Sequence, residues 1–287
     1  MGYLVLSIVC SSLIFVIFKL YSRYQVQTSY AIIINYMTAS SVGFLYNNEP
    51  FGFVGLLTKN WFIPTLFLGL LFILIFNLIA KTSQVLGVSV ASVATKMSLT
   101  IPVLFGVFLY KEDLGLFKII GVLLALAAVY FVSVKGNGRV FSIKDLYLPS
   151  MVFLGSGLID AAIQYGEQVM VPENEFPLFS ATVFACAACW GVGFVSIKML
   201  RTPMRIQPRT LIGGIALGVP NYFTVYFLLR ALQNEVLNSA SVFTINNVAV
   251  VMICTLLGIV LFKEVISPKN WIGIFLAVIS IILVIVF

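Results

Sequence analysis

Apolar runs of about twenty residues occupy nearly all of this 287-residue chain, and no other feature limits its fold as strongly. The hydrocarbon core of a bilayer is about 30 Å thick, a distance that an α-helix of roughly 20 residues crosses. Clusters of charged and turn-forming residues separate ten such runs, with approximate limits 2–20, 28–46, 61–80, 87–109, 114–134, 148–168, 177–199, 210–231, 237–262 and 269–287. We therefore expect an all-α, polytopic membrane protein with ten transmembrane helices.

The composition excludes an ordinary soluble domain. Hydrophobic residues make up 61% of the chain and charged residues 9%, with a mean hydropathy of +1.10, whereas soluble domains carry about a quarter charged residues. The first apolar run is followed directly by others of the same kind, so we expect it to remain as a span rather than to be removed as a signal peptide. The connections between the runs are short, and no soluble domain is expected between them.

The basic residues indicate an orientation in the membrane. The net charge is +7, and the basic residues lie between the apolar runs rather than among exposed aromatic residues, so we expect a lipid bilayer and no nucleic acid as partner. Cytoplasmic loops retain Lys and Arg. The side of the termini carries four, Lys59, Lys111, Lys118 and Arg230, and the other side carries twelve, Lys19, Arg23, Lys81, Lys135, Arg139, Lys144, Lys198, Arg201, Arg205, Arg209, Lys263 and Lys269. This bias predicts that both termini face away from the cytoplasm. We expect the membrane to be a bacterial inner membrane.

Metal, redox and nucleophilic chemistry are disfavoured by the residue types present. The four cysteines, Cys10, Cys186, Cys189 and Cys254, all lie inside apolar runs, where they pack as small hydrophobic side chains. Cys186 and Cys189 form a C-x-x-C pair, but there is no second pair and no histidine, so a zinc or redox site is not expected. The lack of histidine also excludes a Ser-His-Asp triad. We expect no catalytic residue, no metal and no cofactor.

An internal repeat divides the chain into two halves. A Lys-Glu pair, a Gly nine residues after the Glu and an Ala four residues later occur twice, 152 residues apart, as Lys111, Glu112, Gly121 and Ala125 and as Lys263, Glu264, Gly273 and Ala277. Upstream, a second set is spaced by 149 residues, with Gly69, Lys81, Ser92 and Val93 matching Gly218, Arg230, Ser241 and Val242. The two spacings, 152 and 149 residues, differ by three, which places three extra residues in the ninth run.

The odd number of runs in each half predicts that the halves are inverted repeats. A five-helix unit re-enters the membrane in the opposite sense, so we expect repeats at 1–134 and 148–287, joined by a connecting loop at 135–147. Gly121 and Gly273 should then make equivalent contacts. This architecture is typical of secondary transporters, whose site lies near the midplane between the halves.

These motifs resemble the drug/metabolite transporter superfamily, and specifically its ten-helix EamA-like members. In that family each half ends in a helix with a central Pro, a turn closing on an acidic residue, and a last helix that opens on Ile-Gly or a similar pair. The corresponding residues are Thr100-Ile101-Pro102-Val103, Lys111-Glu112 and Ile120-Gly121 in the first half, and Lys263-Glu264 and Ile272-Gly273 in the second, where Val251 replaces the Pro. The resemblance covers essentially the entire chain. It implies transport of a small solute, since the family carries amino acids, sugars, nucleotide sugars, phosphorylated metabolites and drugs.

Lys96 lies nine residues into the fourth run, at a depth where an ionisable side chain indicates function. Spacings of 3, 4 and 4 put Ser89, Ser92, Lys96 and Thr100 on one helical face. We expect this face to line an interior cavity, with Lys96 binding an anionic group of the solute and Ser92 contributing to the same site. The alternatives are a structural ion pair with Asp160 and a lysine that extends away from the midplane.

Asp160 lies near the middle of the sixth run and has a polar face of its own. Spacings of 4, 4 and 3 align it with Ser156, Gln164 and Glu167. We expect Asp160 and Gln164 to contact the solute, and Asp160 or Glu167 to exchange a proton or hold an amine. Glu167 lies close to the end of its run, so a solvated boundary position is an equal alternative.

Asparagines inside the runs form a further group of candidates, at Asn35, Asn77, Asn221, Asn246 and Asn247. Each amide can bind a solute or a neighbouring helix. We favour solute contact for Asn221, because the preceding Pro220 leaves a free carbonyl near it, and for Asn247, which shares a face with Ser241 and Thr244. Asn35 is included as a third candidate contact.

We therefore expect a secondary transporter that moves a small metabolite or drug-like solute by alternating access, coupled to protons or driven by exchange, as a monomer or weak homodimer. A non-transporting membrane partner and, less favoured, a membrane-embedded enzyme are the alternatives. A channel would need a ring of selectivity groups or an assembly of identical subunits, whereas the sequence has a two-fold repeat.

Overall fold

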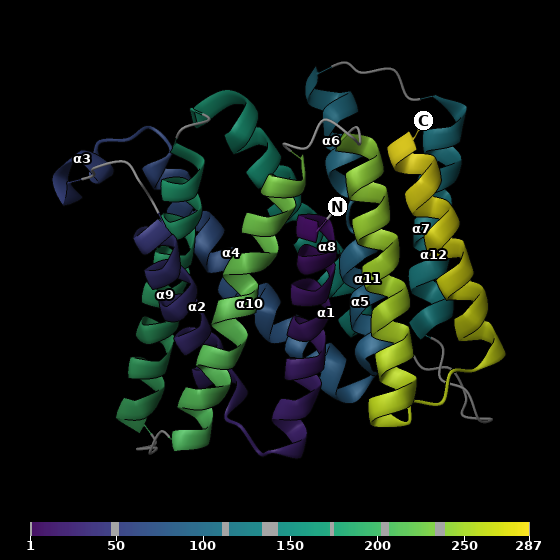
Figure 1. The fold of residues 1–287 in the computed structure, drawn as a ribbon, viewed down its shortest axis with the longest axis horizontal. Helices are drawn as coiled ribbons and strands as arrows, with labels where there is room; N and C mark the ends of the chain where they lie inside the picture. The colour runs from purple at the N-terminus through teal and green to yellow at the C-terminus, as the bar shows by residue number, and fades with distance from the viewer. Residues whose placement is uncertain are drawn as a thin grey trace. The chain divides into compact units, whose positions relative to one another are not determined.

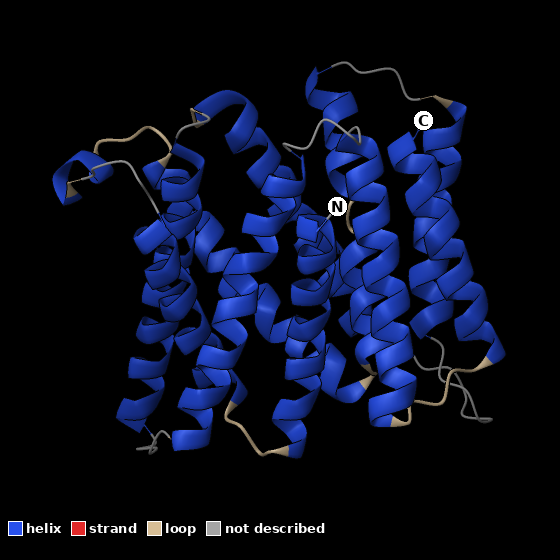
Figure 2. Cartoon of the chain, in the orientation of Figure 1, coloured by secondary structure: helices blue, strands red, loops and turns tan. Residues whose placement is uncertain are grey.

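The computed structural model describes residues 2–46, 52–110, 115–133, 143–172, 175–201, 207–232 and 239–286. Within these ranges all regular secondary structure is helical (Figure 2). The elements are α1 (Gly2–Arg23), α2 (Thr28–Tyr46), α3 (Phe53–Leu57), α4 (Phe62–Val85), α5 (Val88–Met97), α6 (Thr100–Tyr110), α7 (Leu116–Ser133), α8 (Ile143–Tyr165), the π-helix η1 (Gly166–Met170), α9 (Phe176–Arg201), α10 (Pro208–Leu232), α11 (Ser239–Phe262) and α12 (Pro268–Val286). The all-α prediction is confirmed for this part of the chain.

Nine stretches of the described chain are long and apolar enough to cross a membrane. They correspond to nine of the ten expected runs, so the protein is an integral, multi-pass membrane protein. The remaining run forms α2, which has 19 residues but is not one of the nine. Polar residues such as Asn35 and Ser40, which are buried in α2, lower its hydropathy.

The fourth run, expected as one helix at 87–109, is broken into α5 and α6. α5 ends at Met97, and the N–H of Ile101 donates to the carbonyl of Ser98 at 2.8 Å in a tight turn. Pro102 has no N–H for the helical bond to Ser98, and its ring would clash with that carbonyl. The helical periodicity on which the predicted polar face relies is therefore interrupted before Thr100, which begins the next helix.

Two further elements differ from the expected boundaries. The connection expected at 47–60 contains the short helix α3, whose Leu56 is buried in a cluster with Trp61. The sixth run ends in the π-helix η1, which follows α8 directly. Neither difference changes the number of apolar runs.

The described helices belong to two compact units. Unit 1 comprises Met1–Leu20, Leu78–Ala161 and Phe223–Phe287, and unit 2 comprises Tyr21–Asn77 and Ala162–Tyr222. Each unit takes segments from both halves of the sequence repeat. A compact unit is therefore not the same as a sequence half.

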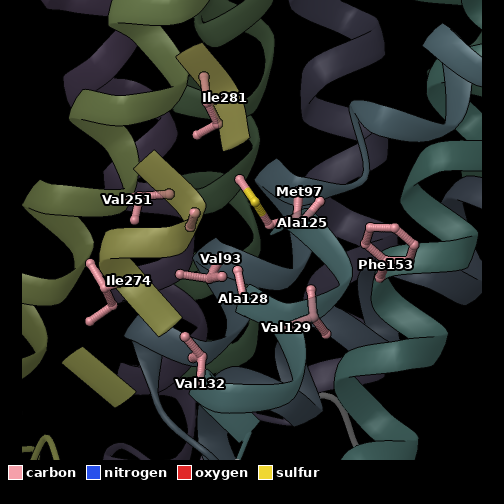
Figure 3. Close-up of a cluster of buried hydrophobic side chains, with 11 residues drawn as sticks. Val93, Met97, Ala125, Ala128, Val129, Val132, Phe153, Val251, Ile274 and Ile281 are labelled. Carbon is pink, nitrogen blue, oxygen red and sulfur yellow. The ribbon is translucent and has the colours of Figure 1, made fainter. Parts of the chain in front are cut away.

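The core of unit 1 lies where α5, α7, α11 and α12 pack together. Figure 3 shows Val93 and Met97 of α5 beside Val129 of α7, with Val251 of α11 and Ile274 of α12 in the same cluster. Lipid tails are as apolar as these side chains, so close packing rather than hydrophobic burial holds such helices together. The cluster fixes α5, which carries Lys96.

α7 and α12 run side by side in unit 1 and contact each other through matched positions (Figure 1). A Cβ added at Gly121 would lie 2.6 Å from Cγ2 of Val284, and one added at Gly273 would lie 2.6 Å from Cγ2 of Val132. Val284 follows Val132 by the same 152 residues that separate the two glycines. The equivalent contacts predicted for Gly121 and Gly273 are confirmed.

Unit 2 is built around the packing of α2 on α9. Tyr36 of α2 is fully buried, and its hydroxyl donates to the carbonyl of Phe72 at 3.0 Å. Its ring stacks on Phe184 of α9, with ring centroids 6.0 Å apart. Aromatic packing thus holds the centre of this unit.

Candidate functional site

The candidate site of unit 1 is organised by α5, a helix of ten residues. Lys96 lies in its last turn, where a cation is favoured by the negative end of the helix dipole. Ser89 and Ser92 lie on the preceding turns with buried side chains, and the Ser92 hydroxyl donates to the carbonyl of Ser89 at 3.0 Å. The predicted alignment of Lys96 with these two serines therefore holds within α5.

Lys96 is partly exposed, and among the described residues it has no hydrogen bond and no ion pair within 4.0 Å. Asp160 of α8 is its principal charged neighbour. The Ser98 hydroxyl lies 3.0 Å from Oδ2 of Asp160 and 2.6 Å from the carbonyl of Thr95, so the two acceptors share its single proton, and Asp160 is partly exposed as well. Two opposite charges thus lie near one another in unit 1 without closing an ion pair.

Buried hydroxyls in the same unit also lack partners. Ser11 of α1 and Ser156 of α8 have side-chain oxygens with no hydrogen-bond partner among the described residues, and each is at most 5% exposed. Leaving a buried hydroxyl unbonded is unfavourable by about 1 to 3 kcal/mol. Each of these two hydroxyls is therefore suited to binding water or a polar molecule.

The asparagines of unit 1 form a neutral polar group. The Ser7 hydroxyl lies 3.0 Å from the carbonyl of Thr224 and 3.4 Å from Oδ1 of Asn246. Asn246 in turn donates to Oδ1 of the predicted contact residue Asn247 at 3.5 Å. Asn247 is 6% exposed.

The remaining predicted residues belong to unit 2. Asn221 donates through Nδ2 to Oδ1 of Asn35 at 3.2 Å, and Asn35 is fully buried. The Nδ2 atom of Asn35 has no partner among the described residues. Gln164 is partly exposed, and the side chain of Glu167 lies outside the described residues. The structure thus joins Asn35 with Asn221, and Asp160 with Ser98.

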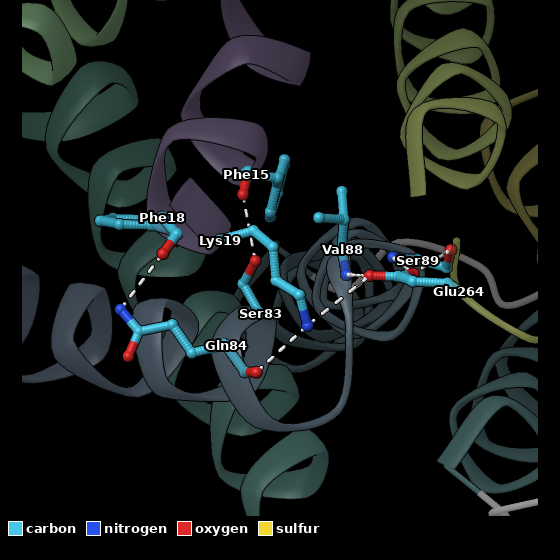
Figure 4. Close-up of polar contacts among 8 residues, drawn as sticks. All are labelled: Phe15, Phe18, Lys19, Ser83, Gln84, Val88, Ser89 and Glu264. Atoms are coloured by element: carbon cyan, nitrogen blue, oxygen red, sulfur yellow. Dashed lines mark hydrogen bonds and ion pairs between the residues drawn. The ribbon is translucent and has the colours of Figure 1, made fainter. Parts of the chain in front are cut away.

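Two polar contacts were missed by the analysis of the sequence. The first is at Ser98, which lies in the break that Pro102 causes. That break is the sequence signal that points to Ser98. Glu264 was treated as a repeat marker, yet its carboxylate accepts hydrogen bonds from the N–H of Val88 at 2.8 Å and from the Ser89 hydroxyl at 3.1 Å (Figure 4). No sequence signal connects a turn after α11 with the start of α5.

Glu175 of unit 2 makes a separate polar contact just before the span Phe176–Ile197. Its Oε1 atom lies 2.5 Å from Nζ of Lys59, and its Oε2 atom accepts from the Trp61 indole at 2.8 Å. These hydrogen bonds, first from Lys59 and then from Trp61, lower the pKa of the Glu175 carboxyl. The contact ties the start of α4 to the start of α9.

Comparisons with known proteins add a family and a fold. No family model matches the chain. A protein of Haemophilus influenzae, described as an uncharacterized protein, is 31% identical over 278 residues, which cover 94% of this chain and 93% of that protein. The chain belongs to that protein's family. One solved crystal structure, whose description says only that it is a protein, is similar to this chain with a TM-score of 0.60 and 16% sequence identity. The similarity covers 98% of this chain and 94% of that chain. This second likeness shows the fold alone.

Proposed function

We propose that this protein is a secondary transporter, an EamA-like member of the drug/metabolite transporter superfamily, that moves a small metabolite or drug-like solute by alternating access. The observation that carries the proposal is Lys96 itself, a lysine inside a membrane span that lies near Asp160 and has no ion pair within 4.0 Å among the described residues. Charge inside a span is unfavourable by roughly 2.5 to 3.5 kcal/mol for a lysine at mid-helix. Lys96 has no ion pair within 4.0 Å among the described residues, so its ammonium remains able to bind a solute.

Lys96 and Asp160 together suit a solute that carries both a positive and a negative group, or an anion that is exchanged for protons. The Lys96 ammonium binds the anionic group of the solute. Asp160 holds an amine or takes up a proton, and the unbonded hydroxyls of Ser11 and Ser156 supply further hydrogen bonds. The break between α5 and α6 supports this assignment, because transporter sites are commonly formed at interrupted helices.

The proposal includes ten spans arranged as two inverted repeats. Gly121 lies near the start of α7 and packs on Val284 near the end of α12, so the two helices are antiparallel. Two antiparallel membrane helices with reciprocal contacts are related by a two-fold axis in the plane of the membrane. The composition of the units also supports the repeat, since unit 2 contains the second and seventh runs whole and most of the third and eighth runs. We place both termini outside the cytoplasm of a bacterial inner membrane on the basis of the loop charges.

The test begins with a solute panel. Purified protein is heated with anions, cations, zwitterions and neutral compounds, because only a binder is stabilised by a solute. Solutes that raise the melting temperature are then used for flux in proteoliposomes with Lys96→Met, Asp160→Asn and the double variant. Thr95→Ala is the matched control, since the Thr95 hydroxyl donates to the carbonyl of Ala91 within α5.

If Lys96 binds the transported solute, the Lys96→Met variant should fold normally and lose flux, and the double variant should also be inactive. If Lys96 and Asp160 were only a structural ion pair, Lys96→Met would lower the melting temperature, and the double variant would recover both stability and flux. Recovered flux in the double variant would contradict the proposal. Protein that no solute stabilises and that supports no flux would favour a non-transporting membrane partner.

A further inference from the structure

The N-terminus of α5 is capped by a residue that is distant in the sequence. The first N–H groups of a helix have no partner within it and carry partial positive charge. Gly87, which precedes α5, offers no side-chain cap. Instead, the Glu264 carboxylate accepts from the N–H groups of Val88 at 2.8 Å and Ser89 at 3.5 Å and from the Ser89 hydroxyl at 3.1 Å. The turn after α11 thus holds the beginning of the helix that carries Lys96.

α1 joins the same contact through Lys19. Its Nζ atom lies 3.9 Å from Oε1 of Glu264 and donates to the carbonyl of Gln84 at 3.1 Å. The Gln84 amide donates to the carbonyl of Phe18 at 3.1 Å, which ties α1 to the end of α4 (Figure 4). One carboxylate therefore links three parts of unit 1: the end of α1, the turn from α4 to α5, and the turn from α11 to α12.

Two glycines leave space for this carboxylate. A Cβ added at Gly87 would lie 2.8 Å from Cδ of Glu264, and one added at Gly258 would lie 2.5 Å from its Oε2. Gly87 also has a φ of 117°, which residues with a side chain rarely adopt. The Glu264 N–H donates to the carbonyl of Gly258 at 3.0 Å, which orients the turn. We call the space bounded by Lys19, Gly87, Val88, Ser89 and Gly258 the carboxylate seat.

We propose that Glu264 in the carboxylate seat is a latch that positions α5, and that transport requires its release in each cycle. The proposal rests on the proposed transport function. Ser89 and Lys96 are separated by seven residues, roughly 10 Å along an α-helix, so a shift at the start of this short helix moves Lys96. The charged contact is suited to reversible release, because Lys19 and Glu264 keep 20% and 13% side-chain exposure at a separation of 3.9 Å. Glu264 is thus a positioning residue that acts through α5.

The first test locks the latch covalently in the full-length protein. Lys19→Cys and Glu264→Cys are joined by a short bis-methanethiosulfonate cross-linker, which dithiothreitol removes. The two native cysteines that are not buried, Cys10 and Cys189, are replaced by Ala so that the cross-linker cannot react with them. Cys186 and Cys254 are buried and are kept. We expect cross-linking to reduce solute flux ~10-fold or more and reduction to restore it, while the solute still raises the melting temperature in both states.

The matched control is the other lysine–glutamate pair, Lys59→Cys with Glu175→Cys, whose native atoms lie 2.5 Å apart in unit 2. Cross-linking this pair should leave flux within about twofold of the reduced protein. Undiminished flux after cross-linking positions 19 and 264 would overturn the latch and leave the transport function intact. If the unmodified protein showed neither solute flux nor solute-induced stabilisation, the proposed transport function would be wrong and the latch with it.

A second measurement weakens the latch without a cross-link. Glu264→Gln keeps the shape of the side chain and removes its charge, and Gly258→Ala keeps the charge and crowds the seat. We expect both variants to increase hydrogen–deuterium exchange at Val88 and Ser89 by ~10-fold and to change turnover per folded molecule, with solute affinity within twofold of the parent. A purely structural cap would lower the melting temperature and leave turnover unchanged. Unchanged exchange in both variants would also overturn the proposal.

Discussion

The two halves of the chain build equivalent runs differently. α11 is one continuous helix of 24 residues, whereas the matching run of the first half is broken into α5 and α6. Pro102 stands after the break, and its match 149 residues later is Val251, which is fully buried inside α11. At the same spacing Lys96 is matched by Ile245. The charge therefore lies in the half whose helix is interrupted.

The polar groups around these runs differ in the same direction. Ser98, next to the break in the first half, meets the carboxylate of Asp160, which belongs to the second half. Asn246, in the matching run of the second half, meets Ser7 of the first half in a neutral contact. The α7–α12 contact, in contrast, uses equivalent residues from both halves. The comparison indicates that the α7–α12 contact is a symmetric frame shared by both halves, whereas Lys96 of the fourth run has no charged counterpart in the ninth run.

The largest expected effect comes from introducing a proline into α11, the continuous helix of the second half. Val251→Pro removes a helical N–H from the continuous α11 and introduces a clash with the carbonyl of Asn247, so we expect a loss of about 3 kcal/mol or more in stability. Pro102→Ala should have no such effect, because α5 already ends before this position. Thermal unfolding in detergent compares the two variants. Equal losses would contradict the difference between the runs.

The symmetric frame is tested by enlarging its two glycines. Gly121→Leu and Gly273→Leu place side chains against Val284 and Val132, and we expect each to lower stability by about 1 to 3 kcal/mol through overpacking. The two losses should be similar because the contacts are equivalent. Gly2→Leu is the control, since nothing lies within 4 Å of a Cβ added there. A large loss at one glycine alone would weaken the case for a repeat.

A smaller effect is expected from the hydroxyl that meets Asp160. Ser98→Ala removes one hydrogen bond to a charged group, which corresponds to about 1.5 to 3 kcal/mol in the most favourable case. Because the Ser98 hydroxyl also donates to the carbonyl of Thr95 at 2.6 Å, the bond to Asp160 is shared and the loss should be nearer the lower value. We also expect weaker solute binding, measured as a smaller solute-induced rise in melting temperature. Thr95→Ala, which removes a local hydroxyl of α5, should leave solute binding unchanged.

The smallest effect concerns Glu175 in unit 2 and its pH dependence. Hydrogen bonds from Lys59 and Trp61 lower the folded pKa of Glu175 below its ordinary value of 4.5. Its stabilisation is therefore complete above pH 4.5 and is lost as the pH falls from that value through the folded pKa. Melting temperature against pH should fall less steeply in this acid range for Glu175→Gln than for the parent. Parallel curves would show that this contact contributes little.

The bilayer explains why so much of the fold follows from the sequence. A span must be apolar, about 20 residues long and helical, because backbone groups have no other partners in lipid. The run expected at 28–46 coincides with α2, and the run expected at 269–287 begins within one residue of α12. The short helix α3 was missed because it lies in a connection, where no such requirement applies.

The candidate site followed from the sequence in part. Lys96 and Asp160 were identified because ionisable residues inside apolar runs are rare. Their surroundings were not, since Ser98 and Asp160 are 62 residues apart and only packing brings them together. The predicted polar face assumes one helix across the turn before Pro102, whereas Thr100 begins α6.

The sequence by itself determined that this chain is a helical membrane protein, because length and apolar composition decide which segments enter a bilayer. It also determined the repeat and the residues whose charge lies inside a span. Only the tertiary structure decided which polar groups are paired. Asn35 meets Asn221, Glu264 caps α5, and Lys96 has no ion pair among the described residues. These contacts depend on how helices that are distant in the chain pack against each other, and short-range sequence patterns carry no information about that packing.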